Sequence, residues 1–496
     1  MRPSMSPIAT AIAIALVAAS CGSAPSPSPT ATPALSALPA SHAAMTPTPG
    51  AGSTGPTASP SPHRPASASL PVHGHALELG EGVRMTPGPN GTLFVALPRS
   101  GGSVLTQFDR NGRPTPGWPI EIKGSTSRGL LLPVADGSVR TVCTMENPEG
   151  NMVDPTVAFA YDPTGGLLDG WPVELIDNVL AGRMIGDDLI VVVSSPRSDV
   201  VESGKPTDDV ALATIAASGE LQRGTSVPVF ETCCRWTIGP DGVVYFVGVE
   251  KGADVGFDEV SRITALDLAG IRPGWPITVD GTGSRPASGP DGQIVVTVSS
   301  YVRGTTRVLS FDPDRTASSS AELSPPTSSY AETGGCQPSQ PQAPVIDENG
   351  RIFVWSEMDD TILALDPSLE QRGGWPYRTA TTLVRPDSRY VQEDAFCPGL
   401  TAPTVGPDGT LYLSVQATDA TVGGSLVAVD PVGRERAGWP VALRRPGGEF
   451  WSGAVGADGT VYALAVELES SRTSSASVLA IAPDSTVLYT TTIIDP

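Results

Sequence analysis

Apolar and polar residues alternate in short segments along the chain, and each segment follows a turn-like pair such as Asp-Gly. Examples read GPDGVVYFVG from Gly239, GPDGQIVVTV from Gly289 and GPDGTLYLSV from Gly406. Strict alternation predicts a half-buried β-strand, and the glycine supplies the positive φ that a tight turn between antiparallel strands needs. The pattern therefore predicts repeated β-hairpins.

This turn-and-strand unit occurs eight times in residues 83–496. One copy, GDDLIVVV from Gly186, is degenerate and has Asp188 in place of the turn glycine. The other copies have Gly91, Gly137, Gly242, Gly292, Gly350, Gly409 and Gly459. Neighbouring copies lie 46 to 59 residues apart, a length that suits one four-stranded propeller blade. We predict an all-β fold, a single eight-bladed β-propeller of four-stranded antiparallel blades over residues 83–496.

A second repeated element closes five of the eight units. It reads, for example, LDLAGIRPGWPITV from Leu266 and LDPSLEQRGGWPYRT from Leu365. The Asp ends a strand and opens a turn, and Gly-Trp-Pro starts the outer strand, where the missing proline N–H breaks no ladder bond. We expect the tryptophans to be structural and to dock between adjacent blades. They are Trp118, Trp171, Trp275, Trp375 and Trp439.

A strand that ends in Ala, a hydrophobic residue and Asp, followed by Gly and then Trp, resembles the PQQ-like, or quinoprotein-type, propeller repeat. Good matches are ALDLAGIRPGW from Ala265 and ALDPSLEQRGGW from Ala364. The resemblance covers residues 83–494 and implies eight blades with docked tryptophans. It implies no single activity, because the family includes dehydrogenases and non-catalytic scaffolds.

The N-terminus has the layout of a bacterial export signal. Arg2 precedes an apolar run, Ile8–Ala19, that has signal-peptide length and is too short to span a bilayer. Small residues then lead to Cys21, as in a lipobox, although Ala18 stands where such boxes usually have Leu. We predict a lipoprotein signal peptide at 1–20 and lipidation of Cys21. The protein would then be extracytoplasmic and membrane-anchored, or secreted if Cys21 is not lipidated.

Residues 21–70 consist almost entirely of Ser, Pro, Ala, Thr and Gly. Such a segment cannot bury enough apolar area to offset the entropy of ordering its chain. We predict a disordered linker, stiffened by its prolines, and a lead-in segment at 71–82. The linker would hold the propeller clear of a lipid surface or cell wall.

Composition restricts the chemistry of the propeller. The net charge is −21, and an acidic surface repels phosphate backbones, so we expect no nucleic-acid partner. The four histidines, His42, His63, His73 and His75, all come before residue 83. A Ser-His-Asp triad or a histidine-bound metal site in the propeller is therefore excluded. We expect no metal, no cofactor and no catalytic residue under the favoured interpretation below.

Five cysteines lie in the predicted propeller. Cys336 and Cys397 stand 14 and 12 residues before two successive turn glycines, and we favour a disulfide between them. Cys233 and Cys234 form a vicinal pair near the inner strand of blade 4. In methanol-dehydrogenase-like quinoproteins, two adjacent cysteines form a ring that packs on the quinone, so PQQ with calcium is the cofactor under an alternative function. A structural pair, or one bridge to Cys143, is the other interpretation; unbridged, Cys143 is expected to be a buried thiol.

Four arginines recur near the start of inner strands. Arg84, Arg235 and Arg285 each precede a turn glycine by seven residues, and Arg183 lies near the same place in blade 3. Equal offsets become equal heights around the axis, so we predict that they converge at the mouth of the central channel and bind an anion. The alternative is that each arginine pairs with a carboxylate of the next blade.

Together these features favour a non-catalytic binding or scaffold module at the cell surface. Its partner would be a surface protein, a glycan or another envelope component. The alternatives are a quinoprotein-like, PQQ-dependent oxidoreductase and a carboxylate-based polysaccharide hydrolase or lyase. We expect a monomer that meets the membrane only through its N-terminal lipid.

Overall fold

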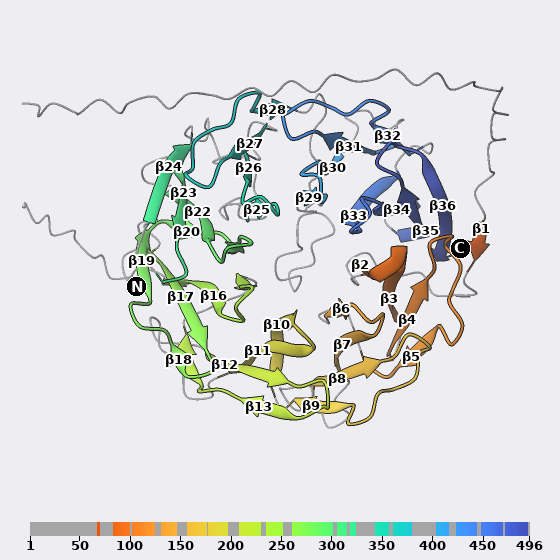
Figure 1. Ribbon diagram of the computed structural model, residues 1–496, viewed down its shortest axis with the longest axis horizontal. Coiled ribbons are helices and arrows are strands. Elements are labelled where there is room, and N and C mark those ends of the chain that lie inside the picture. Colours follow the sequence, from red (N-terminus) through yellow and green to blue (C-terminus); the bar gives the residue numbers. More distant parts are fainter. Residues whose placement is uncertain are drawn as a thin grey trace, which may run out of the picture. The chain divides into compact units, whose positions relative to one another are not determined.

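Eight β-sheets surround one axis in the computed structural model (Figure 1). The structure describes residues 67–69, 83–99, 102–124, 130–145, 156–175, 177–196, 208–229, 235–250, 260–300, 305–314, 318–323, 343–356, 361–378, 403–415, 423–443, 448–469 and 472–494. Each sheet is built from consecutive strands, with the first strand nearest the axis and the last at the periphery. The predicted eight-bladed propeller of antiparallel blades is confirmed.

The first four blades include the one with the degenerate turn. Blades 1 and 2 consist of β2 (Arg84–Pro87), the 3-10 helix η1 (Pro89–Gly91), β3 (Leu93–Arg99), β4 (Gly102–Phe108) and β5 (Ile120–Ile122), then β6 (Leu131–Pro133), β7 (Val139–Thr144), β8 (Thr156–Tyr161) and β9 (Val173–Leu175). Blades 3 and 4 consist of β10 (Asn178–Ile185), β11 (Asp188–Pro196), β12 (Asp208–Ile215), β13 (Leu221–Arg223) and β14 (Val227–Val229), then β15 (Trp236–Ile238), β16 (Val244–Glu250), β17 (Val260–Asp267), β18 (Gly270–Ile271) and β19 (Ile277–Asp280).

The last four blades complete the ring. Blades 5 and 6 consist of β20 (Thr282–Gly283), β21 (Ala287–Ser288), β22 (Ile294–Ser300), β23 (Thr305–Phe311) and β24 (Ser318–Leu323), then β25 (Val345–Ile346), β26 (Ile352–Ser356), β27 (Thr361–Leu365) and β28 (Tyr377–Arg378). Blades 7 and 8 consist of β29 (Thr404–Val405), β30 (Leu411–Val415), β31 (Ser425–Val429) and β32 (Val441–Ala442), then β33 (Glu449–Val455), β34 (Val461–Glu469), β35 (Arg472–Ile481) and β36 (Val487–Ile494).

One further strand comes from the segment before the propeller. β1 (Ser67–Ser69) pairs in parallel with β36, placing Ser67 opposite Thr490. It lies at the end of the range for which the sequence predicts a disordered linker. The rest of that range lies outside the described residues. Among the described residues, no helix is long and apolar enough to cross a bilayer.

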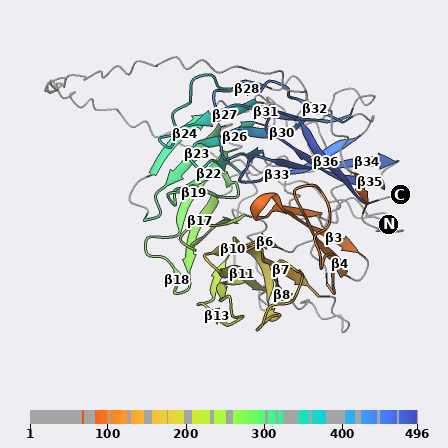
Figure 2. The same ribbon diagram turned by 45° about the vertical axis from the view of Figure 1, so that its right-hand side comes forward.

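Eight hydrophobic clusters hold the blades together, one at each seam between neighbours. They form because alternate residues of each strand face the blade before and the blade after. The seam between blades 8 and 1, where β3 and β4 come near β34 and β35, closes the ring (Figure 2). Leu93 and Val95 of β3 pack there with Tyr462 of β34 and Tyr489 of β36. Thr491 Oγ1 also donates to the Gly112 carbonyl of blade 1 at 2.9 Å.

The five Gly-Trp-Pro tryptophans are wedges between blades. Each has no more than 8% of its surface exposed and is followed by a cis proline. The Trp118 indole N–H donates to the Pro163 carbonyl of the next blade at 3.0 Å, and that of Trp171 to the Ala217 carbonyl at 3.1 Å. The tryptophan thus buries a large apolar ring and satisfies its one donor in the neighbouring blade.

Candidate functional site

The connections between strands divide over two faces of the ring. Successive strands run in opposite directions, so the turns that join first to second and third to fourth strands lie on one face, here called the turn face. The opposite strand ends define the other face, here called the loop face, and the number of residues between successive strand ends there varies widely, from residues 100–101 between β3 and β4 to residues 379–403 between β28 and β29. Variable connections on a rigid scaffold are the usual place for binding residues. The inner strands begin on this loop face.

Two arginines from different blades bind the inner strand of blade 4. Arg183, on β10 of blade 3, donates from Nη1 to the Ile238 carbonyl at 2.6 Å. Arg285, which precedes β21 in blade 5, donates from Nε to the Trp236 carbonyl at 2.7 Å. Both arginines are exposed, and both acceptors belong to β15. Arg235 directly precedes this strand, so three of the four predicted arginines gather around β15.

The pairing of β15 explains why these carbonyls are available. The Val247 N–H donates to the Arg235 carbonyl at 3.2 Å, so alternate residues starting at Arg235 turn their backbone groups toward β16. The carbonyls of Trp236 and Ile238 lie on the other edge, which faces the axis because β15 is innermost. They are two residues, or about 7 Å, apart along the strand. The two guanidiniums are therefore anchored side by side on this axial edge.

Arg183 lies nearer the turn face than the sequence spacing of the arginines predicts. Arg84 is opposite the third residue beyond Leu93, whereas Arg183 is opposite the first residue beyond Leu189, the counterpart of Leu93 in blade 3. The difference of two residues is about 7 Å along the strand. Its cause is the shorter turn of the degenerate repeat, which joins β10 directly to β11 through two residues.

Arg84 lies apart from the other three arginines. It begins β2 in blade 1, and two blades separate it from blade 4. The residue is exposed, yet desolvation by the surrounding blade lowers the pKa of its guanidinium. We therefore define the arginine site as Arg183, Arg235 and Arg285.

Threonines tie neighbouring inner strands at two other seams. Thr86 on β2 donates to the Leu131 carbonyl on β6, and Thr404 on β29 donates to the Gly453 carbonyl on β33, both at 3.0 Å. A hydroxyl has one donor and spends it on such a bond, whereas a guanidinium has five N–H donors. An arginine at the same kind of position can tie two blades and also carry charge to the axis.

The described inner strands contain little other charge. Beside the arginines, their one ionisable residue is Glu449 in β33. The whole protein has a net charge of −21. The arginines therefore bring positive charge close to the axis of an acidic molecule, and positive charge attracts an anion locally.

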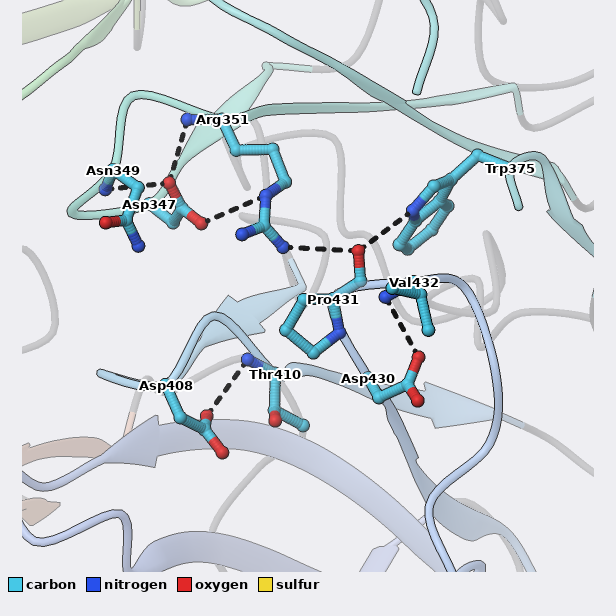
Figure 3. Close-up of polar contacts among 9 residues, drawn as sticks. All are labelled: Asp347, Asn349, Arg351, Trp375, Asp408, Thr410, Asp430, Pro431 and Val432. Carbon is cyan, nitrogen blue, oxygen red and sulfur yellow. Dashed lines mark hydrogen bonds and ion pairs between the residues drawn. The ribbon is translucent and has the colours of Figure 1, made fainter. Parts of the chain in front are cut away.

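A second charged cluster joins blades 6 and 7, and its polar groups contact one another (Figure 3). The Asp347 carboxylate accepts the Arg351 backbone N–H at 2.8 Å and lies 3.4 Å from the Arg351 guanidinium. Arg351 Nη1 and the Trp375 indole N–H both donate to the Pro431 carbonyl, each at 3.4 Å. Asp347 and Arg351 are 4% and 8% exposed. This cluster is a joint between blades, and the sequence analysis did not single it out.

A groove of about 490 Å³ runs along the outer part of the seam between blades 1 and 2. Phe159 and Tyr161 stack with parallel rings along it, and Met145 and Ile122 complete an apolar lining. Glu174 stands at its edge. The groove lies on the outside of the ring, away from the arginine site, and Glu121 and Lys123 also line it.

Most of the predicted cysteine chemistry falls outside the described residues. Cys21 and the pairs Cys233–Cys234 and Cys336–Cys397 all lie there, so lipidation and disulfide bonding stay predictions. Cys143 is described: it is free and fully buried, and burial raises the pKa of its thiol to about 12. Within the described ranges, no group of acidic, histidine or cysteine side chains could hold a metal ion.

Comparisons with known proteins assign the chain to no family. No protein-family model and no curated protein matches the chain. Puromycin hydrolase is 15% identical with a TM-score of 0.44, over 78% of this chain and 59% of that one. A putative 6-phosphogluconolactonase from Bacteroides fragilis is 13% identical with a TM-score of 0.41, over 82% of this chain and 96% of that one. Virginiamycin B lyase from Staphylococcus aureus is 11% identical with a TM-score of 0.37, over 80% and 97%.

These likenesses are too distant to support any statement about activity. The fold defines the chain as a β-propeller protein. Its membership of the PQQ-like repeat family stays a prediction from the Ala-hydrophobic-Asp…Gly-Trp pattern.

Proposed function

We propose that this protein is a non-catalytic binding module that holds an anionic group of its ligand at the arginine site, beside the axis of the propeller. The observation that carries the proposal is the convergence of Arg183 and Arg285, from two blades, on the axial edge of β15 in a third. The planar guanidinium fork matches carboxylate and sulfate oxygens and binds them through two parallel hydrogen bonds.

The charge of the arginines supports the same proposal. Cations held close together repel one another, so an anion that lies between them gains attraction from each. The rest of the molecule is acidic, which leaves this region as a local attractor for negative groups.

The chemistry of the site supports binding over catalysis. Guanidiniums keep their protons in proteins and do not act as general bases. The chain has no histidine after His75, so a base at this site would have to be a carboxylate. The arginine site is suited to holding a charged group in one orientation.

The location of this module is a proposal from the sequence. The signal-like N-terminus and Cys21 support a propeller outside the cytoplasm, tethered by a Pro-rich linker. A surface protein, a glycan or an envelope component that carries carboxylate or sulfate groups would be within reach there.

Calorimetric titration at low salt tests the proposal. A galacturonic acid trimer should bind, and its neutral galactose counterpart should not. Arg183→Gln and Arg285→Gln should each weaken binding by about tenfold to a hundredfold, because a hydrogen bond to a charged group contributes about 1.5–3 kcal/mol. Arg378→Gln, which removes an exposed arginine from the outer strand β28, is the matched control and should leave affinity unchanged.

Two results would refute the anion site. One is equal affinity for the acidic and neutral trimers. The other is binding that survives the Arg183→Gln/Arg285→Gln double substitution in a protein whose melting temperature shows that it is folded.

A further inference from the structure

A β-bulge interrupts the inner strand of blade 3 beside the arginine site. The register between β10 and β11 shifts between Val179 and Ala181, so Leu180 is the extra residue. Bulges re-aim a side chain and are common next to binding sites. Leu180 is 40% exposed, although its strand is the innermost of the blade.

The place of Leu180 distinguishes it from other exposed apolar residues. Among the described residues, the exposed large hydrophobic side chains are Leu167, Leu180, Ile271, Val432 and Leu488. The four others lie in the turn that follows the third strand or in an outer strand. Leu180 alone of this set lies on an inner strand.

Leu180 and the arginine site belong to adjacent inner strands. Leu180 precedes Arg183 by three residues on β10, a distance of about 10 Å along the strand. β10 lies beside β15, the strand whose axial edge anchors Arg183 and Arg285. One exposed apolar side chain therefore lies three residues from Arg183, on the side toward the loop face.

We propose that the ligand is an amphiphilic anion, a carboxylate joined to an apolar chain. The head group binds the guanidiniums of Arg183 and Arg285, and the chain lies against Leu180. This inference rests on the proposed anion site and specifies the class of ligand that the site takes. A purely hydrophilic anion would leave the exposed leucine in water.

A series of straight-chain carboxylates, from acetate to octanoate, tests this assignment. Affinity should rise with chain length, by up to about fourfold for each methylene that becomes buried. Alkylammonium ions of the same lengths should not bind, because their charge has the wrong sign. The series is measured by calorimetry on the intact protein, below the concentrations at which the longer chains form micelles.

Two substitutions separate the apolar contact from the charged one. Leu180→Asn should flatten the dependence on chain length and leave the affinity for acetate unchanged. Arg183→Gln should weaken every carboxylate by a similar factor and preserve the chain-length dependence. Leu488→Asn, which alters a leucine 46% exposed on the outer strand β36, is the control and should change neither.

The outcomes distinguish this inference from the function on which it rests. If all carboxylates bind equally well and Arg183→Gln weakens them all, the anion site stands and the amphiphilic ligand is refuted. A chain-length dependence that persists in Leu180→Asn also refutes it, because the chain then lies elsewhere. If no carboxylate binds, or if the arginine substitutions change nothing, both proposals fall.

Discussion

Arg140 lies over the indole ring of Trp171, with its guanidinium carbon 5.5 Å from the ring centroid. It is the second residue of the second strand of blade 2. Four other blades have an aromatic residue at this place, against the tryptophan of the same blade. The pairs are Phe94–Trp118, Tyr245–Trp275, Phe353–Trp375 and Tyr412–Trp439. Blade 2 therefore supports its wedge with a cation–π contact where the others use a ring.

Because other blades have an aromatic ring at this place, we expect position 140 to tolerate an aromatic residue. Arg140→Tyr should keep the free energy of unfolding within about 1 kcal/mol of the natural protein, because a ring at this place meets the tryptophan in other blades. Arg140→Ala should lower it by about 2 kcal/mol, since it removes a buried cation–π contact and leaves a void. Urea unfolding measures both. Equal losses in the two variants would show that position 140 does not support the wedge.

The wedges themselves should dominate the stability of the seams. Trp118→Ala should lower the free energy of unfolding by about 3–5 kcal/mol, the usual range for removing a buried large aromatic side chain. Trp118→Phe retains most of the packing and loses the hydrogen bond to the Pro163 carbonyl, so its loss should be smaller. Unchanged melting temperatures in both would mean that the Gly-Trp-Pro motif serves recognition instead.

The fold could be predicted from the sequence because every blade repeats the same local chemistry. An Asp-Gly or Asn-Gly turn and an alternating strand report pairing between neighbours in the chain, and propeller blades consist of such pairs. Even the degenerate copy could be counted, since its apolar alternation survives without the turn glycine. Its true turn, Gly186 and Asp187, could not be located, and this error carried over to the height of Arg183.

Features that depend on contacts between blades could not be predicted in the same way. Asp347 belongs to a turn whose sequence resembles those of exposed aspartates, and only packing against blade 7 buries it with Arg351 (Figure 3). In the sequence, the break in alternation at Leu180 looks the same as the end of a strand, so the bulge could not be predicted. The equal offsets of the arginines predicted a cluster. The strand that anchors them could not be predicted, because it depends on the directions in which the backbone carbonyls point.

The seam that closes the ring gives a test with a matched control. Gly112 has φ +74°, and a β-carbon there would lie 2.4 Å from the Tyr489 ring. Gly186 has φ +60° and nothing within 4 Å of the same point. Both alanine substitutions strain the backbone by about 1–2 kcal/mol. Only Gly112→Ala adds a steric clash of about 1–3 kcal/mol.

Gly112→Ala should therefore be the more destabilising substitution in urea unfolding, by roughly the clash energy. It also displaces the Gly112 carbonyl that accepts the Thr491 hydroxyl. Equal destabilisation by the two substitutions would indicate that blade 8 and blade 1 separate easily, and that the seam adds little to the stability of the ring.

Anchoring can be examined in the native cell. Cys21→Ser should abolish incorporation of radiolabelled palmitate and move the protein from the membrane fraction to the medium or the periplasm. A Cys143→Ser variant is the control, since that thiol is buried inside blade 2. Membrane association that persists without Cys21 would contradict the lipoprotein prediction.

Buried ionisable groups predict how stability changes at alkaline pH. Burial raises the pKa of Cys143 to about 12 from an ordinary value of 9.0, and raises the pKa of Tyr161 to about 12 from 10.0. These groups lose their protons more readily in the unfolded chain, which then binds fewer protons than the folded protein. Stability should therefore be constant with respect to them below pH 9 and fall as pH rises from 9 toward 12.

The cysteine and the tyrosines can be separated by where the decline begins. Each group contributes a slope of at most about 1.4 kcal/mol per pH unit between its unfolded and folded pKa values. In Cys143→Ala the decline that starts near pH 9 should disappear, and the tyrosine decline that starts near pH 10 should remain. The substitution also lowers stability at every pH by leaving a small cavity, so the slope and not the absolute value is the readout. Unfolding midpoints in urea at half-unit steps from pH 7 to pH 11 measure it. An unchanged slope between pH 9 and 10 would mean that the Cys143 thiol ionises as easily in the folded protein as in the unfolded chain, and that blade 2 admits water to its core.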